Sequence, residues 1–246
     1  MGEKKNRTDH LWKYSTILLA GLLIGYIIGR FELTTVNFVL NPQGSEAKNT
    51  NTTAEDKKED TASAQNPVDV NIEGDLILGK DDATITLIDF SDFECPFSKK
   101  FYTEIFADLK RDFIDTGKVK YIFKDYPLNL HPNALPAAIA AECAGQQNKY
   151  WEMHNKIFDT QTVWSGLENA DETFKTYAGE IGLNLTKYTD CTGLQSIKDE
   201  IYSDREDGIN AGARSTPTLF INGMILRGVP QSYDQLKQYL ESQLGN

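Results

Sequence analysis

Cys95 is the residue in this sequence with the clearest chemical potential. It is followed directly by Pro96 and stands between a short apolar segment and a helical pattern. Proline is favoured at the first position of a helix, so Cys95 is expected at a helix N-terminus. The partial positive charge and free N–H groups there stabilise a thiolate, the reactive form of cysteine. The pattern favours a reactive thiol, and a buried structural cysteine is the alternative.

The elements around Cys95 are predicted from the periodicity of the apolar residues. Residues 84–90 are apolar and rich in β-branched side chains, which predicts a buried strand. After Cys95, apolar residues recur every four positions, which predicts a helix that ends at Thr116-Gly117. Residues 119–124 predict a second strand. This strand–helix–strand order predicts a parallel, right-handed unit.

The rest of the chain completes an α/β pattern. From Asn133 to about Gly212 the spacing is helical, and residues 216–226 predict two strands joined by an Asn-Gly turn. Residues 233–240 predict a closing helix. A sheet covered by helices is the fold class that buries these apolar faces.

The segment around Cys95 resembles the active site of exported DsbA-like thiol–disulfide oxidoreductases. That segment is residues 92–101, and further matching segments are 126–127, 131–132, 140–144, 150–154 and 215–223. The resemblance covers residues 68–246. It implies a thioredoxin-like fold with an inserted helical subdomain at about 128–212, and thiol–disulfide chemistry without a cofactor.

The resemblance also assigns roles to residues outside the Cys95 segment. Pro217 is expected to be a cis-proline facing Cys95, and Thr216 to offer backbone groups to an extended substrate peptide. Asp89 stands six residues before Cys95, where the family often carries a buried acid. Lys124 is the expected ion-pair partner of Asp89, because a buried carboxylate needs a partner or a shifted pKa. A backbone hydrogen bond to Asp89 is the alternative.

The sequence departs from the family pattern at Ser98. The family has Cys-x-x-Cys, whereas this chain reads Cys95-Pro96-Phe97-Ser98. Serine cannot supply the second sulfur, so dithiol oxidase activity is doubtful and monothiol chemistry is expected. Pro96 and Phe97 are expected to support the site. Ser98 is expected to hydrogen-bond the thiolate, while the charge of Glu94 opposes it.

Cys143 and Cys191 lie 48 residues apart within the expected insertion. A structural disulfide there is common in the proteins that the sequence resembles, so we expect these two cysteines to pair. Two buried free thiols are the alternative.

His131 and His154 are expected to be structural. No further ligands with suitable spacing accompany them, so no metal site is predicted. His131, before Pro132, is expected in a loop or at a helix start. His154 is expected in packing or on the surface.

The N-terminal part is expected to be an anchor and a tether. Residues 14–33 include an uncharged run, 14–29, and are predicted to form an uncleaved transmembrane signal anchor. A cleaved signal peptide and a buried helix are the alternatives. Basic residues in 1–13 predict a cytoplasmic N-terminus. Residues 34–67 are predicted to be a disordered linker, because 41–67 contains no Val, Ile, Leu, Met or aromatic residue.

These features predict a single-pass protein of the bacterial cell membrane with an extracytoplasmic C-terminal domain. Protein thiols and disulfides are its expected substrates, and a membrane redox partner or a small thiol its expected electron partner. Gly21, Gly25 and Gly29 share one helix face, which would suit a homodimer. The net charge of −11 argues against nucleic-acid binding. The alternative function is a redox-inactive peptide-binding or chaperone module. In a third hypothesis, Cys95 forms a disulfide with one dedicated partner or with a dimer mate.

Overall fold

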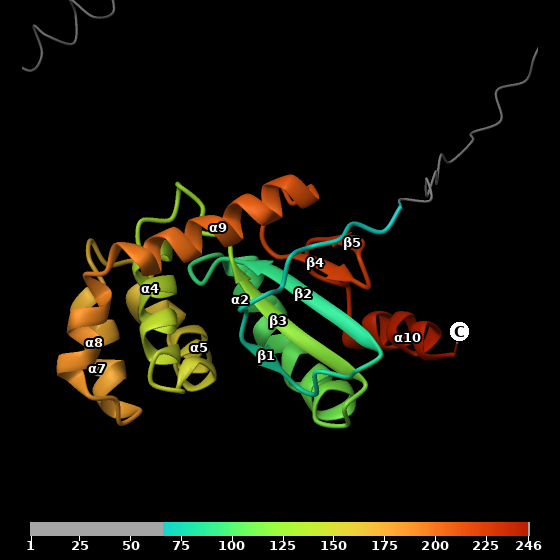
Figure 1. Cartoon of the computed structure of the whole chain (residues 1–246), viewed down its shortest axis with the longest axis horizontal. Coiled ribbons are helices and arrows are strands. Elements are labelled where there is room, and N and C mark those ends of the chain that lie inside the picture. Colours follow the sequence, from blue (N-terminus) through green and yellow to red (C-terminus); the bar gives the residue numbers. More distant parts are fainter. Residues whose placement is uncertain (1–65, 246) are drawn as a thin grey trace, which may run out of the picture. The chain divides into compact units, whose positions relative to one another are not determined.

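The computed structural model describes residues 66–245, which form a five-stranded sheet in the order β1-β3-β2-β4-β5 (Figure 1). The neighbours β2 and β3 are parallel, and the pairs β1–β3, β2–β4 and β4–β5 are antiparallel. The predicted strand–helix–strand unit and the Asn-Gly hairpin are therefore confirmed. The strands are β1 (Ile77–Leu78), β2 (Ile85–Ser91), β3 (Val119–Asp125), β4 (Thr218–Ile221) and β5 (Met224–Arg227).

The central strand β2 is buried on both of its faces. Because side chains alternate along a strand, Leu87 and Phe90 point to opposite sides of the sheet. Leu87 belongs to the core beneath the helix that follows Cys95 and beneath α10 (Tyr233–Leu244), whereas Phe90 faces α9 (Gln195–Ala211). The α9 backbone lies very close to the sheet, because a Cβ added to Gly208 would come within 2.8 Å of the Phe90 ring.

The helix after Cys95 runs without a break from residue 96 to residue 114. It consists of α2 (Pro96–Phe101), η1 (Tyr102–Phe106), α3 (Ala107–Leu109) and η2 (Lys110–Ile114), where η denotes π-helix. An α-helix has 3.6 residues per turn, so an apolar stripe with four-residue spacing would drift around it. The wider π turns keep this stripe on the core side, and its four members are buried: Phe101, Ile105, Leu109 and Phe113.

The helical insertion lies between β3 and β4 and is closed by a disulfide. The Cys143–Cys191 bond joins α4 to α8 across a Cα–Cα distance of 5.7 Å, so the expected pairing is confirmed. Two free thiols are thereby ruled out. The helices are α4 (Ala134–Gly145), α5 (Tyr150–Asp159), α6 (Gln161–Trp164), α7 (Asp171–Glu180), α8 (Leu185–Thr192) and α9.

The predicted ion pair between Asp89 and Lys124 is wrong. The register places Asp89 opposite Phe123 and Phe90 opposite Lys124, so the Lys124 side chain points to the other face of the sheet. Its Nζ lies there 2.8 Å from Asp75, 2.7 Å from Asp204 and 3.4 Å from Asp207. Lys124 thus ties the segment before β1 and α9 to β3.

The predicted anchor, residues 14–33, and residues 34–65 of the predicted linker lie outside the described residues. Within residues 66–245, no helix has the length and apolar character needed to cross a membrane.

Removing the disulfide should destabilise the folded domain. A covalent loop of 48 residues restricts the unfolded chain by about 4 kcal/mol in the chain-entropy model. We expect the Cys143→Ala/Cys191→Ala variant to lose about that much free energy of unfolding in urea titrations at pH 7. Wild-type protein in a strong reductant is the matched control and should lose a similar amount. An unchanged urea midpoint in both samples would contradict the prediction.

Replacing Lys124 should also destabilise the domain. Lys124→Met leaves the buried Asp204 and its acidic neighbours without their cation, which costs about 3–5 kcal/mol for buried ion pairs. The free energy of unfolding in urea measures the loss. Lys149→Met is the matched control, because Lys149 pairs with Glu152 in an exposed position, and we expect a change below about 1 kcal/mol. Equal effects of the two substitutions would count against the buried cluster.

Candidate functional site

Cys95 stands at the N-terminus of the helix that follows β2. It is the N-cap of α2 in an extended conformation, and Pro96 occupies the first turn. The Cys95 N–H donates to the Asp92 carbonyl at 3.0 Å, and the Lys99 N–H donates to the Cys95 carbonyl at 3.0 Å. The helix-start position expected from the sequence is therefore confirmed.

The segment before β4 lies against the sulfur. The Thr216–Pro217 peptide bond is cis, as expected. The Cys95 Sγ–H donates to the Thr216 carbonyl oxygen at 3.4 Å. Cys95 is only 4% exposed, so the Thr216–Pro217 segment covers one side of the thiol. The pairing of β4 with β2 brings these two distant parts of the chain together.

Ser98 is buried and makes its hydrogen bonds away from Cys95. Its Oγ accepts from the Ser91 hydroxyl at 2.9 Å and from the Asp92 N–H at 3.4 Å. The expected hydrogen bond from Ser98 to the sulfur is not formed in this structure, in which the thiol donates to Thr216. Sequence reasoning missed Ser91, which gives no local signal at the end of an apolar strand.

Asp89 is a buried acid on the same side of β2 as Ser91. Its Oδ2 accepts from the Tyr121 hydroxyl at 2.9 Å, whereas its Oδ1 has no hydrogen-bond partner among the described residues. Burial raises the pKa of Asp89 to about 7, against the opposing effect of the Tyr121 and Ser91 hydroxyls. The alternative expectation, a backbone hydrogen bond to Asp89, is also not observed, because the donor is the Tyr121 hydroxyl.

Asp92 and Glu94 hold the Cys95 segment to the helical insertion. The Asp92 Oδ2 accepts from the Leu128 N–H at 2.9 Å and lies 2.8 Å from the His131 Nδ1. The Glu94 Oε2 accepts from the Asn133 N–H at 2.6 Å. Burial raises the pKa of both carboxyl groups. The Glu94 carboxylate, expected to oppose the thiolate, is thus turned to the loop before α4.

A second connection comes from α6. The Gln161 side-chain amide donates to the Phe93 carbonyl at 2.6 Å and to the Cys95 carbonyl at 3.1 Å. It therefore fixes the backbone on both sides of Glu94. Sequence analysis missed Gln161, because it lies 66 residues from Cys95 and belongs to no recognisable motif.

The two predicted structural histidines are placed as expected. His131 lies in the loop before α4 and contacts Asp92. Burial lowers the pKa of His154 to about 4, so the ring is neutral at pH 7. His154 is packed within 6.3 Å, between ring centroids, of a cluster of aromatic side chains: Phe93, Tyr102, Phe106, Phe123, Tyr150, Trp151 and Phe158.

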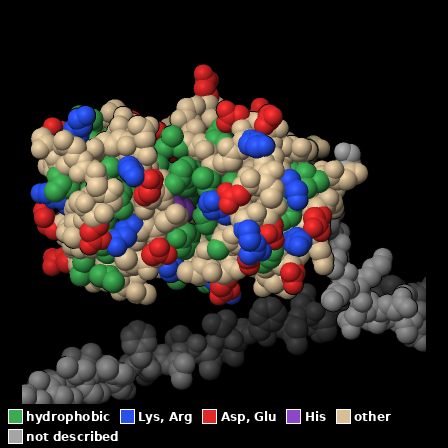
Figure 2. Space-filling view, turned by 90° about the horizontal axis from the view of Figure 1, so that it is seen from below, with side chains coloured by type: hydrophobic (Ala, Val, Ile, Leu, Met, Phe, Trp, Pro, Cys, Tyr) green, Lys and Arg blue, Asp and Glu red, His purple; other side chains and the backbone are tan. Residues whose placement is uncertain are grey.

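A shallow apolar depression lies beside the thiol. The Phe97 side chain, 62% exposed, and Val229 border a hollow of about 390 Å³ that also includes Thr216. An exposed aromatic next to the reactive sulfur suits contact with apolar residues of a protein substrate. On the face shown in Figure 2, hydrophobic side chains gather in the middle and both signs of charge are scattered around them.

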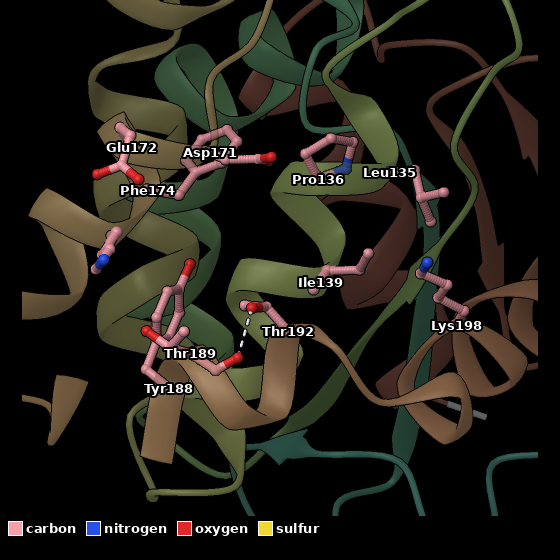
Figure 3. A pocket seen from close by; sticks show the side chains of 11 residues that line it. Leu135, Pro136, Ile139, Asp171, Glu172, Phe174, Tyr188, Thr189, Thr192 and Lys198 are labelled. Carbon is pink, nitrogen blue, oxygen red and sulfur yellow. Dashed lines mark hydrogen bonds between the residues drawn. The ribbon is translucent and has the colours of Figure 1, made fainter. Parts of the chain in front are cut away.

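Another hollow, of about 370 Å³, lies within the helical insertion (Figure 3). Its lining combines apolar side chains such as Ile139 with Asp171, Glu172, Lys175 and Lys198. None of the residues that contact Cys95 lines it. It belongs to the insertion and is not part of the thiol site.

Comparisons with known proteins agree with this geometry. The family described as Thioredoxin matches residues 71–242. Disulfide bond formation protein D of Bacillus subtilis is 33% identical over 184 residues, which are 71% of this chain and 79% of that protein. The Na(+)/H(+) antiporter NhaA 1 of Mycolicibacterium gilvum is 33% identical over 164 residues, or 65% of this chain, but this match covers only 25% of the antiporter.

Solved structures show the same fold. Oxidised BdbD from Bacillus subtilis superimposes with a TM-score of 0.66 at 25% identity, covering 73% of this chain and 98% of that one. The alpha-DsbA1 of Wolbachia pipientis gives 0.64 at 24% identity, covering 72% and 94%. With a thiol at a helix N-terminus beside a cis-proline, this chain belongs to the thioredoxin family as a DsbA-like thiol–disulfide oxidoreductase.

Proposed function

We propose that this chain exchanges thiols and disulfides of extracytoplasmic proteins through Cys95 alone. The observation that carries the proposal is the state of the three cysteines, all of which lie within the described residues. Cys143 and Cys191 are bonded to each other, and Cys95 is free. Because Ser98 occupies the second position of the motif, the chain has no sulfur with which Cys95 could store a disulfide.

The proposed reaction has two exchange steps. The Cys95 thiolate attacks one sulfur of a substrate disulfide, so that a mixed disulfide forms and the other substrate sulfur leaves as a thiolate. A second thiol, from the substrate or from a small molecule, then attacks the mixed disulfide and releases Cys95. The number of disulfide bonds is unchanged in each step, which suits isomerisation, or reduction when the second thiol is supplied from outside.

The substrate is proposed to bind where the cis-proline segment meets the apolar depression. Thr216, which precedes the cis-proline Pro217, lies at one edge of this region, and the exposed Phe97 ring forms the other. An extended peptide bound there would place its disulfide beside Cys95. The naming of a relative as a disulfide bond formation protein supports proteins as the substrates.

We also propose that the domain is held at the outer side of the bacterial cell membrane. The support is the uncharged run of residues 14–29 with basic residues before it. The N-terminus would stay in the cytoplasm, and residues 34–67 would tether the domain. A membrane redox partner or a small thiol would supply electrons, and the Gly21, Gly25 and Gly29 face would allow a dimer.

The monothiol proposal predicts stable mixed disulfides. After incubation of the full chain with an oxidised two-cysteine peptide at pH 7, intact-mass spectrometry should show a peptide adduct on Cys95. Cys95→Ala should form none. In the matched variant Ser98→Cys, the new thiol should resolve the adduct internally. The adduct should therefore fall at least about tenfold, and a disulfide between Cys95 and the introduced cysteine should replace it.

Failure to form adducts would contradict the proposal. A chain that binds the peptide without an adduct would instead be a peptide-binding module. A single adduct with one cellular protein, and none with the peptide, would indicate a dedicated partner.

The membrane proposal predicts the behaviour of a truncated chain. Full-length protein expressed in bacteria should stay with membranes after extraction at alkaline pH, because a spanning helix is held by its buried apolar surface. A chain starting at residue 34 behind a cleavable export signal should be soluble after the same treatment. Protease added to intact spheroplasts should digest the full-length domain. Protection from that protease would show the opposite orientation.

A further inference from the structure

A hollow of about 250 Å³ lies between the loop after β3 and α9. It is smaller than the cavities of about 300–1,000 Å³ that take whole small molecules, so its size suits one side chain of a larger ligand. Its wall is largely apolar, and Pro127, Leu128, Pro132 and Leu135 contribute to it. Arg205 of α9 is the cation of this lining, and we call the cavity the Arg205 hollow.

Arg205 has no oxygen partner among the described residues. Its Nε is buried without a hydrogen bond, and none of the ion pairs within residues 66–245 includes it. Its Cζ lies 5.9 Å from the centre of the Tyr126 ring, which offers a π face and no acceptor oxygen. The other arginines of the described chain each donate to a carboxylate or a carbonyl oxygen: Arg111, Arg214 and Arg227.

The position of Arg205 on α9 explains why no acid of this helix pairs with it. Side chains three or four positions apart on a helix are close enough to interact. The residues at these positions are all uncharged: Ile201, Tyr202, Gly208 and Ile209. The acids nearby in sequence, Asp204 and Asp207, bind Lys124 instead. A guanidinium group with five N–H donors is therefore left without a counter-ion in the described domain.

The Arg205 hollow lies at the same end of the sheet as Cys95. Because β2 and β3 are parallel, the segments that follow them leave the sheet at one edge, and Figure 1 shows α9 next to this edge. Asp92 joins the two segments, since it accepts from the Leu128 N–H at 2.9 Å and lies 2.8 Å from the His131 Nδ1. Both of these partners line the hollow. Asp92 is three residues from Cys95, so their Cα atoms are at most about 11 Å apart.

Exposed apolar side chains flank the Arg205 hollow. Tyr202 lines it and is 48% exposed. Leu130 is 73% exposed and stands between Asn129 and His131, which both line the hollow. Exposed apolar residues that gather at one place are typical of contact with another protein. The matching ligand therefore combines a carboxylate for Arg205 with apolar residues beside it.

We propose that the Arg205 hollow binds a carboxylate of the polypeptide whose disulfide reacts at Cys95. The inference rests on the thiol–disulfide exchange proposed above and adds a property of its substrates, an acidic side chain or a C-terminus next to apolar residues. The guanidinium group holds the carboxylate with two parallel N–H donors, which is the geometry that arginine favours for this group. Arg205 is a binding residue and takes no part in the exchange of sulfurs.

The test is a scan of peptides that form an adduct with Cys95 in the full chain. Each probe is an otherwise uncharged, acetylated and amidated peptide with one cysteine in a disulfide to 2-thiopyridine. The Cys95 thiolate attacks the peptide sulfur, the S–S bond of the probe breaks, and pyridine-2-thione leaves and is followed by stopped-flow absorbance. Glu or Gln occupies one position, two to eight residues from the cysteine on either side. Eight extended residues span up to about 27 Å, enough to pass Asp92 and reach the hollow.

We expect the Glu peptide to react about tenfold faster than its Gln counterpart at one position or at two neighbouring ones, because it gains a charge-assisted hydrogen bond. Arg205→Gln should bring this ratio to about one, and Arg205→Glu should favour Lys over Glu at the same position. Lys149→Gln removes an exposed cation elsewhere and should keep the wild-type ratio. Each ratio compares two peptides on one protein, so a general loss of structure cancels. Peptides that end at this position with a free carboxylate or an amide identify a C-terminus as the source.

The outcomes separate this inference from the function on which it rests. A ratio within about twofold of one at every position, or a Glu advantage that survives Arg205→Gln, means that the hollow is no carboxylate site, while exchange at Cys95 stands. A Glu advantage that Lys149→Gln also removes would reveal a general effect of charge and would equally overturn the inference. If the wild-type chain forms no adduct with any of the peptides, both proposals are wrong.

Discussion

The site depends on β2 being paired along both of its edges. Parallel pairing with β3 places Ser91 opposite Asp125, and antiparallel pairing with β4 brings Thr216 to the Cys95 sulfur. Neither contact could be kept if β2 slipped by one residue, because every side chain would then change face. The reactive thiol is consequently placed by the sheet, although it belongs to a helix.

The domain buries several ionisable groups, and the cost of their burial is offset in different ways. Lys124 is neutralised by three acids from the segment before β1 and from α9, and Asp92 and Glu94 accept hydrogen bonds from backbone N–H groups. Asp89 has a phenol donor and a raised pKa. A buried carboxyl group without donors costs several kcal/mol, so the burial of these groups depends on the partners that each of them has.

The sequence predicted what depends on local pattern. The strand before Cys95, the helix start at Pro96 and the Asn-Gly hairpin all follow from spacing and residue type. Pro217 and the disulfide required the family resemblance, because neither is fixed by its neighbours. The predicted Asp89–Lys124 ion pair was wrong because it was inferred from neighbouring strands without knowledge of their register. The observed register places the two side chains on opposite faces of the sheet. The contacts of Gln161 and Ser91 with the site were not predicted, because hydrogen bonds between residues distant along the chain have no local sequence pattern.

The two carboxylates beside Cys95 make the active-site segment dependent on the helical insertion for hydrogen-bond donors. Asp92 and Glu94 accept hydrogen bonds from the backbone N–H groups of Leu128 and Asn133, which lie at the start of the insertion. A shortened chain that lacked these residues would keep two buried acids beside its thiol, with the Glu94 N–H as the remaining donor to Asp92. Removal of the insertion in evolution or by design would therefore demand simultaneous replacement of both acids. A change in the segment around Cys95 therefore has to be matched by a change in the helical insertion.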